Sequence, residues 1–282
     1  MAIPLQLAGM AALAFISSAA VLGPAYGQDS SDWAQGVNSR VRLISGGVQN
    51  GRHLAGIEIV LDKGFKTYWR HPGESGLPPR FEWAGSRNLA GVELKWPVPS
   101  RTKDAGGVAH SYSERVIFPL LVSPTDPKQP VRLQVRAEYG VCKDICIPAR
   151  AEFALTLNKT GLYGPTIEQA LARVPREQPL NAPEPLSVLR VEPMSGDKPS
   201  VAVVVRFPTG ATPSLFVEAP ENWFLSPAAE PKEGPAGEGR FSVLIDDRPK
   251  DASGPVPLRL TLVAGDQAIE SEVRLDAAAL PR

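Results

Sequence analysis

Short runs in which apolar and polar residues alternate recur along this chain, separated by turn residues. In the first half they fall at 40–44, 56–61, 92–96, 116–122, 131–138 and 153–157. In the second half they fall at 186–191, 201–207, 214–218, 241–245, 258–263 and 269–275. Alternation at period two over a few residues is typical of strands that bury one face. The pattern therefore predicts an all-β protein built from antiparallel sandwiches.

One segment, residues 166–174, has helical periodicity instead. Its apolar positions share one face of a helix, namely Ile167, Ala170, Leu171 and Val174. Thr166 and Gln169 match a capping box at the start, and Pro175 would end the helix. The proline-rich residues 175–185 then have the composition of a linker.

These boundaries predict how the chain is divided. We expect two immunoglobulin-like antiparallel β-sandwich domains, at residues 35–160 and 186–282, joined by the short helix and proline-rich linker of residues 161–185. The second domain contains no cysteine or histidine. Any part it takes in the chemistry would therefore be through binding.

The N-terminal segment is apolar and carries no charged side chain through Leu22. Small residues at Ala25 and Gly27 fit a cleavage site before Gln28, which predicts a signal peptide at residues 1–27. The alternative is a retained membrane anchor, because the apolar stretch is long and lacks a basic start. Either way the rest of the chain is exported to a compartment where disulfides persist.

Charge and composition exclude several classes of function. Thirty basic residues balance thirty acidic ones and are interspersed with them, so we expect no nucleic-acid partner. Downstream of residue 27 no further stretch of roughly 18 apolar residues occurs. Glycine and proline are abundant, with 25 and 29 residues, which fits many short strands joined by tight turns.

The chain contains only two cysteines, Cys142 and Cys146, separated by three residues. In an extended strand their Cα atoms would lie about 13 Å apart at roughly 3.3 Å per residue. A disulfide needs Cα atoms within about 7 Å, so the segment must bend. We expect Tyr139-Gly140 to interrupt the preceding strand and Pro148 to close a hairpin-like connection.

Three interpretations of the cysteine pair remain open from the residues alone. A structural bridge is one, although a loop this short stabilises a fold by only about 2 kcal/mol or less. A copper or zinc site with His71 or His110 is another, but no further residues have chelating spacing. Redox exchange is the third and is the interpretation we favour. Lys143 would favour a thiolate there, whereas Asp144 and Glu138 would oppose it.

Three motifs in order resemble the periplasmic N-terminal domain of the DsbD family, and more closely its ScsB-like branch. They are the residues 64–79 (GFKTYWRHPGESGLPP), 112–120 (YSERVIFPL) and 139–148 (YGVCKDICIP). The resemblance covers residues 35–160. It implies a periplasmic, immunoglobulin-like sandwich that needs no cofactor. It also implies that a cysteine pair takes electrons from a membrane-embedded donor of DsbD type and passes them to exported oxidised client proteins.

The resemblance also implies roles for individual residues. Cys142 and Cys146 match the redox pair, and Cys146 would be the attacking thiol because the family's C-terminal cysteine meets donor and acceptors. The better-known members space the pair by five residues rather than three. Their cap loop carries adjacent aromatics, whereas the matching residues 103–109 have none, so His110 and Tyr112 are candidates to shield the pair.

Full-length members continue into a membrane domain and a thioredoxin-like domain, which this sequence does not contain, so we expect electrons to come from another protein. The alternative function is a non-catalytic exported binding or scaffold module with a structural disulfide, or else a copper-handling protein. The aromatic residues are expected to form sandwich core; they are Tyr68, Trp69, Phe81, Trp83 and Trp96.

Overall fold

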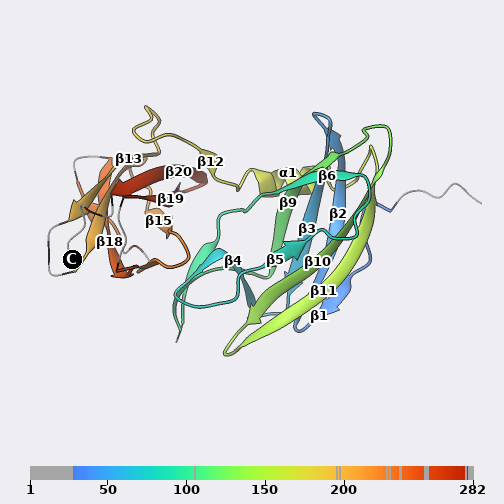
Figure 1. Ribbon diagram of the computed structural model, residues 1–282, viewed down its shortest axis with the longest axis horizontal. Helices are drawn as coiled ribbons and strands as arrows, with labels where there is room; N and C mark the ends of the chain where they lie inside the picture. Colours follow the sequence, from blue (N-terminus) through green and yellow to red (C-terminus); the bar gives the residue numbers. More distant parts are fainter. Residues whose placement is uncertain are drawn as a thin grey trace, which may run out of the picture.

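A computed structural model describes residues 28–276 and Ala278, apart from positions 105, 195, 197, 227, 229, 235, 236 and 251–253. The described chain is almost entirely β-structure with one short helix, which confirms the predicted all-β class (Figure 1). The signal peptide predicted for residues 1–27 lies outside the described residues. Within the described part, no helix is long and apolar enough to cross a membrane.

The first half of the chain forms two sheets that face each other. One has the strand order β1-β2-β3-β9-β6, with bounds Ala34–Gly36, Ser39–Gln49, Arg52–Leu61, Arg115–Pro124 and Leu89–Leu94. The other has the order β11-β10-β4-β8-β7, with bounds Cys146–Leu157, Val131–Cys142, Lys66–Gly73, Gly107–Ser113 and Ser100–Asp104. The short strand β5 (Arg80–Glu82) pairs with β10 as well. All pairings in this half are antiparallel, as the alternating pattern predicts.

The second half also forms two sheets. One has the order β12-β20-β19-β15, with bounds Arg176–Glu177, Gln267–Asp276, Pro255–Ala264 and Pro213–Glu218. The other has the order β13-β14-β18-β16, with bounds Ser187–Met194, Ser200–Arg206, Glu238–Asp247 and Phe224–Leu225, and β17 (Lys232–Glu233) pairs with β18. Strand β12 comes from the segment expected to be a linker and pairs in parallel with β20. Part of that segment therefore belongs to a sheet.

Each pair of sheets encloses its own apolar core. Trp69 and Phe118 are fully buried in the first core, and Phe241 is fully buried in the second. The rings of Trp96 and Phe81 pack on Phe118 with centroids 5.0 and 5.6 Å away. Four of the five aromatic residues expected in the sandwich core therefore lie in it or against it. Tyr68 does not, because it packs with Ala109 and Cys142 in a separate cluster.

The single helix, α1 (Gly164–Leu171), differs from the predicted helix at 166–174. It begins two residues earlier with Pro165 in its first turn, and its N-cap is Tyr163, which makes no side-chain capping bond. The predicted capping box of Thr166 and Gln169 is therefore wrong. Proline is favoured in the first turn because the amide it lacks has no partner there. Burial of Ile167 against the sheet then determines where the helix lies.

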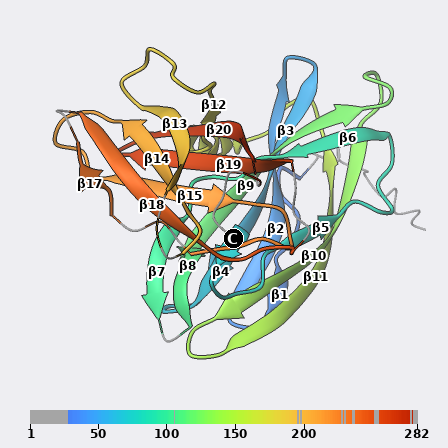
Figure 2. The same cartoon turned by 60° about the vertical axis from the view of Figure 1, so that its left-hand side comes forward.

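The two pairs of sheets contact each other at strands β4 and β8 (Figures 1 and 2). Arg70 of β4 donates to Glu218 of β15 at 2.7 Å and also to Glu270 of β20. Phe216 of β15 packs edge-on against Trp69 and His110, with centroids 5.6 and 4.8 Å away. Ionic and aromatic contacts therefore join the two halves at one junction.

Candidate functional site

The two cysteines form a disulfide at the tip of the β10–β11 hairpin. Figure 2 shows this hairpin, in yellow-green, ending at the bottom of the view. Cys142 is the last residue of β10, Cys146 is the first of β11, and their Cα atoms lie 4.1 Å apart. The expected bend is present, but its position differs from the prediction. Gly140 does not interrupt the strand; it pairs with Pro148 inside the ladder, and the turn is confined to residues 143–145.

The register of the hairpin explains why the cysteines can bridge. The Gly140 amide donates to the Leu77 carbonyl at 3.2 Å, so it points away from β11. Gly140 and Pro148 are thus a pair without mutual hydrogen bonds, and proline, which has no amide hydrogen, is tolerated there. Pairs alternate along an antiparallel ladder, so Cys142 and Cys146 are also a pair of this kind. Such pairs have the closer Cα atoms, about 4.5 Å apart.

Exposure distinguishes the two sulfur-bearing residues. Cys142 is only 3% exposed and packs with Tyr68 and Ala109, whereas Cys146 is exposed. In thiol–disulfide exchange the attacking or attacked sulfur must be reachable by the partner. The geometry therefore leaves Cys146 accessible to another protein, whereas neighbouring residues cover Cys142.

Two exposed apolar side chains lie near Cys146. Ile145 at the tip of the turn is 72% exposed, and Leu77 in the loop between β4 and β5 is 41% exposed. A Cβ atom added to Gly140 would lie 2.8 Å from Leu77 Cβ and 3.3 Å from Cys146 Sγ. Only glycine at position 140 lets the Leu77 loop and the disulfide approach this closely. Lys143 lies over the ring of Phe65, 6.0 Å from its centroid.

The proposed shielding by His110 and Tyr112 is not what the structure shows. Both side chains are buried: His110 faces Trp69 and Phe216, and Tyr112 donates to the Pro97 carbonyl at 2.6 Å. The residue beside Cys146 is Leu77, which no sequence motif marked as a site residue. The signal available was the sequence Gly-Leu-Pro-Pro, because a leucine in a glycine- and proline-rich loop has no strand face on which to be buried.

The Leu77 loop is tied to the hairpin of β7 and β8. The amide of Val108 donates to Glu74 Oε2 at 2.5 Å, and the amide of Glu74 donates to the Val108 carbonyl at 3.0 Å. Gly73 and Gly76 adopt positive φ angles of 87° and 125° on either side. Those conformations favour glycine, so they fix the path that brings Leu77 to the disulfide.

The two histidines considered as metal ligands lie together at the junction of the sandwiches. Their ring centroids are 6.1 Å apart. Burial lowers the pKa of both: that of His110 falls to about 4 despite its hydrogen bond to the His71 carbonyl, and that of His71 falls although Glu218 opposes the shift. Among the described residues, no group of three or more histidine, cysteine, aspartate or glutamate side chains is placed to hold a metal ion.

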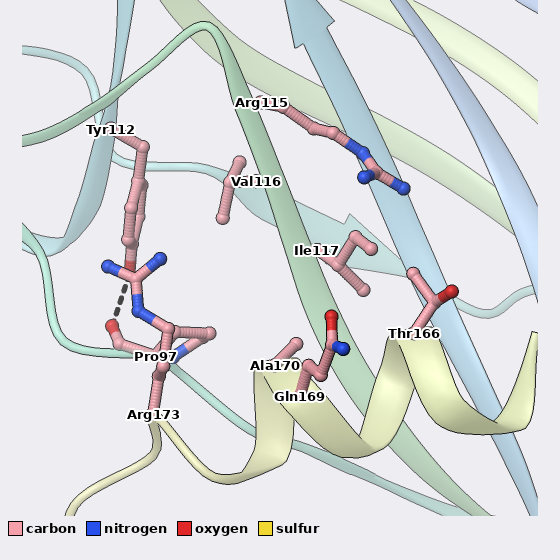
Figure 3. A pocket seen from close by; sticks show the side chains of 9 residues that line it. All are labelled: Pro97, Tyr112, Arg115, Val116, Ile117, Thr166, Gln169, Ala170 and Arg173. Carbon is pink, nitrogen blue, oxygen red and sulfur yellow. Dashed lines mark hydrogen bonds between the residues drawn. The ribbon is translucent and has the colours of Figure 1, made fainter. Parts of the chain in front are cut away.

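A separate cavity of about 200 Å³ lies between β9 and α1 (Figure 3). Arg115 and Arg173 line it together with the ring of Tyr112, whose bond to Pro97 is the dashed line in the figure. Arg115 is already paired with Glu58 at 2.6 Å. The cavity contains no thiol, so it is not the site of the cysteine chemistry.

Comparison with known proteins identifies what the cysteine-bearing half is similar to. Residues 39–158 match the family model described as thiol:disulfide interchange protein DsbD, N-terminal. The fold is similar to the crystal structure of the N-terminal periplasmic domain of ScsB from Proteus mirabilis, with a TM-score of 0.66 at 20% sequence identity. That likeness covers 88% of this chain and 98% of the other, so it extends beyond residues 39–158. No curated protein matches this chain in sequence. The resemblance drawn from the motifs is confirmed.

Proposed function

We propose that the protein exchanges thiols and disulfides through Cys142 and Cys146, because residues 39–158 match the family model of the DsbD N-terminal domain and the two cysteines are bonded to each other. The observation that carries the proposal is the asymmetry of the pair. Cys146 is exposed at a hairpin tip and bonded to Cys142, which is 3% exposed. A bridge across so short a loop contributes little stability, about 2 kcal/mol or less, which favours a chemical role over a structural one.

The exchange proceeds in two steps that conserve atoms and electrons. The Cys146 thiolate attacks one sulfur of a client disulfide; a Cys146–client bond forms and the second client sulfur leaves as a thiolate. The Cys142 thiolate then attacks Cys146 Sγ, which re-forms the bridge and releases the first client sulfur. Two electrons pass to the client, whose two thiolates take up protons from water.

The same pair must be reduced again for a second turnover. A membrane-embedded dithiol donor of DsbD type supplies those two electrons by the reverse exchange, also at Cys146, and no cofactor is needed. In this proposal the protein acts in the periplasm, and exported oxidised proteins are its clients. Residues 35–160 form the exchange domain in this proposal, and the second sandwich, residues 186–282, takes part by binding.

Single cysteine variants test the assignment of roles. In Cys142→Ser the exposed Cys146 remains and lacks its resolving thiol, so we expect a mixed disulfide with a partner to accumulate. In Cys146→Ser only the buried Cys142 remains, so we expect no adduct. Non-reducing electrophoresis of each variant from the exported compartment, followed by identification of the adduct, measures this.

The reduction potential of the wild-type pair, measured by equilibration with glutathione, tests the structural alternative. A structural bridge lies below about −300 mV, whereas we expect this pair well above that value. Adducts only in Cys146→Ser would reverse the roles of the two cysteines. A potential below that limit, together with two variants that form no adduct, would show that the bridge is structural.

A further inference from the structure

A furrow of about 260 Å³ runs along the outer face of the sheet beside the disulfide. Leu77, Pro78 and Arg80 line one side, Pro148 and Arg150 line the other, and Glu138 lies between them. The disulfide is at one end of this furrow, because Leu77 and Pro148 are the neighbours of Cys146 and Gly140 described above. The furrow therefore adjoins the proposed exchange site.

Residues that pair across neighbouring strands form rows along the furrow. Cys142 and Cys146 form the first row, and Gly140 and Pro148 form the second, with Leu77 beside them. The third row holds Arg80, Glu138 and Arg150 on three adjacent strands. Side chains two residues apart along a strand share a face, so all three rows point outward.

The third row is positively charged. Arg150 pairs with Glu138 at 2.8 Å, and within the described part of the chain Arg80 makes no ion pair. Two arginines therefore face one glutamate. The next row along the sheet has the opposite balance of charge, with one arginine and two glutamates. Arg136 forms ion pairs there with Glu152 at 2.9 Å and with Glu82 at 3.7 Å. Among the charged residues that line the furrow, the excess of positive charge therefore lies in the third row.

The strand edge limits how a partner can lie there. Strand β11 is at the end of its sheet order in the described structure. Pro148 lies near its start and has no amide to donate, so an added strand would lose a ladder hydrogen bond just beside the disulfide. A partner that enters the furrow is held by its side chains on the outer face.

We propose, on the basis of the function above, that this furrow binds the extended segment next to the reactive cysteine of a client protein. An extended client rises by the same roughly 3.3 Å per residue as β11, so its side chains match the rows. An apolar side chain about two residues from the client cysteine lies against Leu77 and Pro148. A carboxylate about four residues from that cysteine lies beside Arg80, the arginine of the third row that Glu138 does not pair with.

Short peptides that carry one cysteine as a mixed disulfide with 5-thio-2-nitrobenzoate test the proposal, because attack on the peptide sulfur releases the coloured thiolate. Each peptide carries one glutamate or one lysine. This residue lies four or six positions from the cysteine, either before or after it. With the reduced full chain we expect the glutamate peptide at four residues, on one side of the cysteine, to react about two- to fivefold faster than its lysine counterpart. Moving the glutamate to six residues should abolish the advantage.

Charge-reversal variants provide the matched comparison. Arg80→Glu should remove or invert the preference for glutamate, whereas Arg132→Glu should leave it unchanged. Arg132 is exposed on the same outer face of β10, six residues beyond Glu138 and outside the furrow. Equal rates for all peptides, or equal effects of the two variants, would overturn the furrow proposal. Absence of reaction with every peptide would instead count against the exchange function itself.

Discussion

At the scale of single residues, His110 is a neutral imidazole held in one tautomer. Its Nδ1 lies 3.0 Å from the His71 carbonyl, which can only accept, so Nδ1 carries the hydrogen. Its Nε2 is buried beside Trp69 and Phe216 and has no partner among the described residues. Protonation would place a second N–H there without an acceptor, and nearby Arg101 and His71 also oppose the charge.

We expect this histidine to make the protein less stable in acid. The pKa of His110 is about 4 in the folded protein, against 6.5 for an ordinary histidine. The unfolded chain binds the extra proton, so the free energy of unfolding should fall as pH decreases from 6.5 to about 4, by on the order of 3 kcal/mol. Urea unfolding at a series of pH values measures this.

His110→Asn is the matched variant, because the asparagine amide retains the donor at the position of Nδ1 and cannot be protonated. The slope of stability against pH between 6.5 and 4 should become shallower in it. An unchanged slope would show that other groups cause the acid sensitivity.

At the scale of elements, helix α1 is positioned by burial rather than by its cap. Ile167 is fully buried among Ile44, Leu54 and Ile117, which come from three strands of the first sheet. The N-cap residue makes no side-chain bond to the helix. The capping sequence therefore contributes less to this helix than its one buried side chain.

Two neighbouring substitutions separate these contributions. Ile167→Ala should destabilise the protein by about 2–4 kcal/mol, because it leaves a cavity in a packed cluster. Thr166→Ala should change stability by less than about 0.5 kcal/mol, whereas loss of a true cap would cost about 1 kcal/mol. Thermal and urea unfolding measure both. If Thr166→Ala lowered the free energy of unfolding by about 1 kcal/mol, Thr166 would act as a helix cap after all, as the sequence predicted.

At the scale of the whole molecule, Arg70 joins the two sandwiches. Its side chain is 19% exposed and binds Glu218 and Glu270, each 15% exposed. Burial acts to lower the pKa of Arg70, but hydrogen bonds and charge interactions with the two glutamates outweigh it and raise that pKa. Glu270 has a further partner in Arg259 at 3.4 Å. The contact between the two sandwiches therefore depends on ion pairs between partly buried charged side chains.

Removal of this one charge should destabilise the protein strongly. Arg70→Met leaves two poorly solvated carboxylates together, so we expect a loss of about 3–5 kcal/mol in the free energy of unfolding. Arg136→Met, at an exposed pair, should change the free energy of unfolding far less. Adding Glu218→Gln and Glu270→Gln to Arg70→Met should recover much of the loss. If the two arginine variants were equally mild, the junction would contribute little.

Several features of this protein follow from the sequence alone. Alternation at period two is a local property of strands, so the main strands of both halves could be predicted, although with bounds that are shorter than, or shifted from, those of the structure. The cysteine pair is also local: three intervening residues require a bend, and the motif around them carries the family resemblance. Short or polar strands such as β4, β5, β7 and β8 were missed because their alternation is weak and their pairing is decided by distant partners.

Only the tertiary structure decided the remainder of the site. In a single strand, Gly140 and Pro148 would each predict a break. In the structure they face each other in the β10–β11 ladder, and the Gly140 amide donates to the Leu77 carbonyl on the side away from β11. The difference in exposure between Cys142 and Cys146 arises from Tyr68 and Ala109 on neighbouring strands. The sequence by itself determined the all-β class, the helix and the thiol pair, since these depend on residues close together in the chain. Which sulfur is exposed, what lies beside it and how the halves join depend on contacts between distant residues, which no local pattern records.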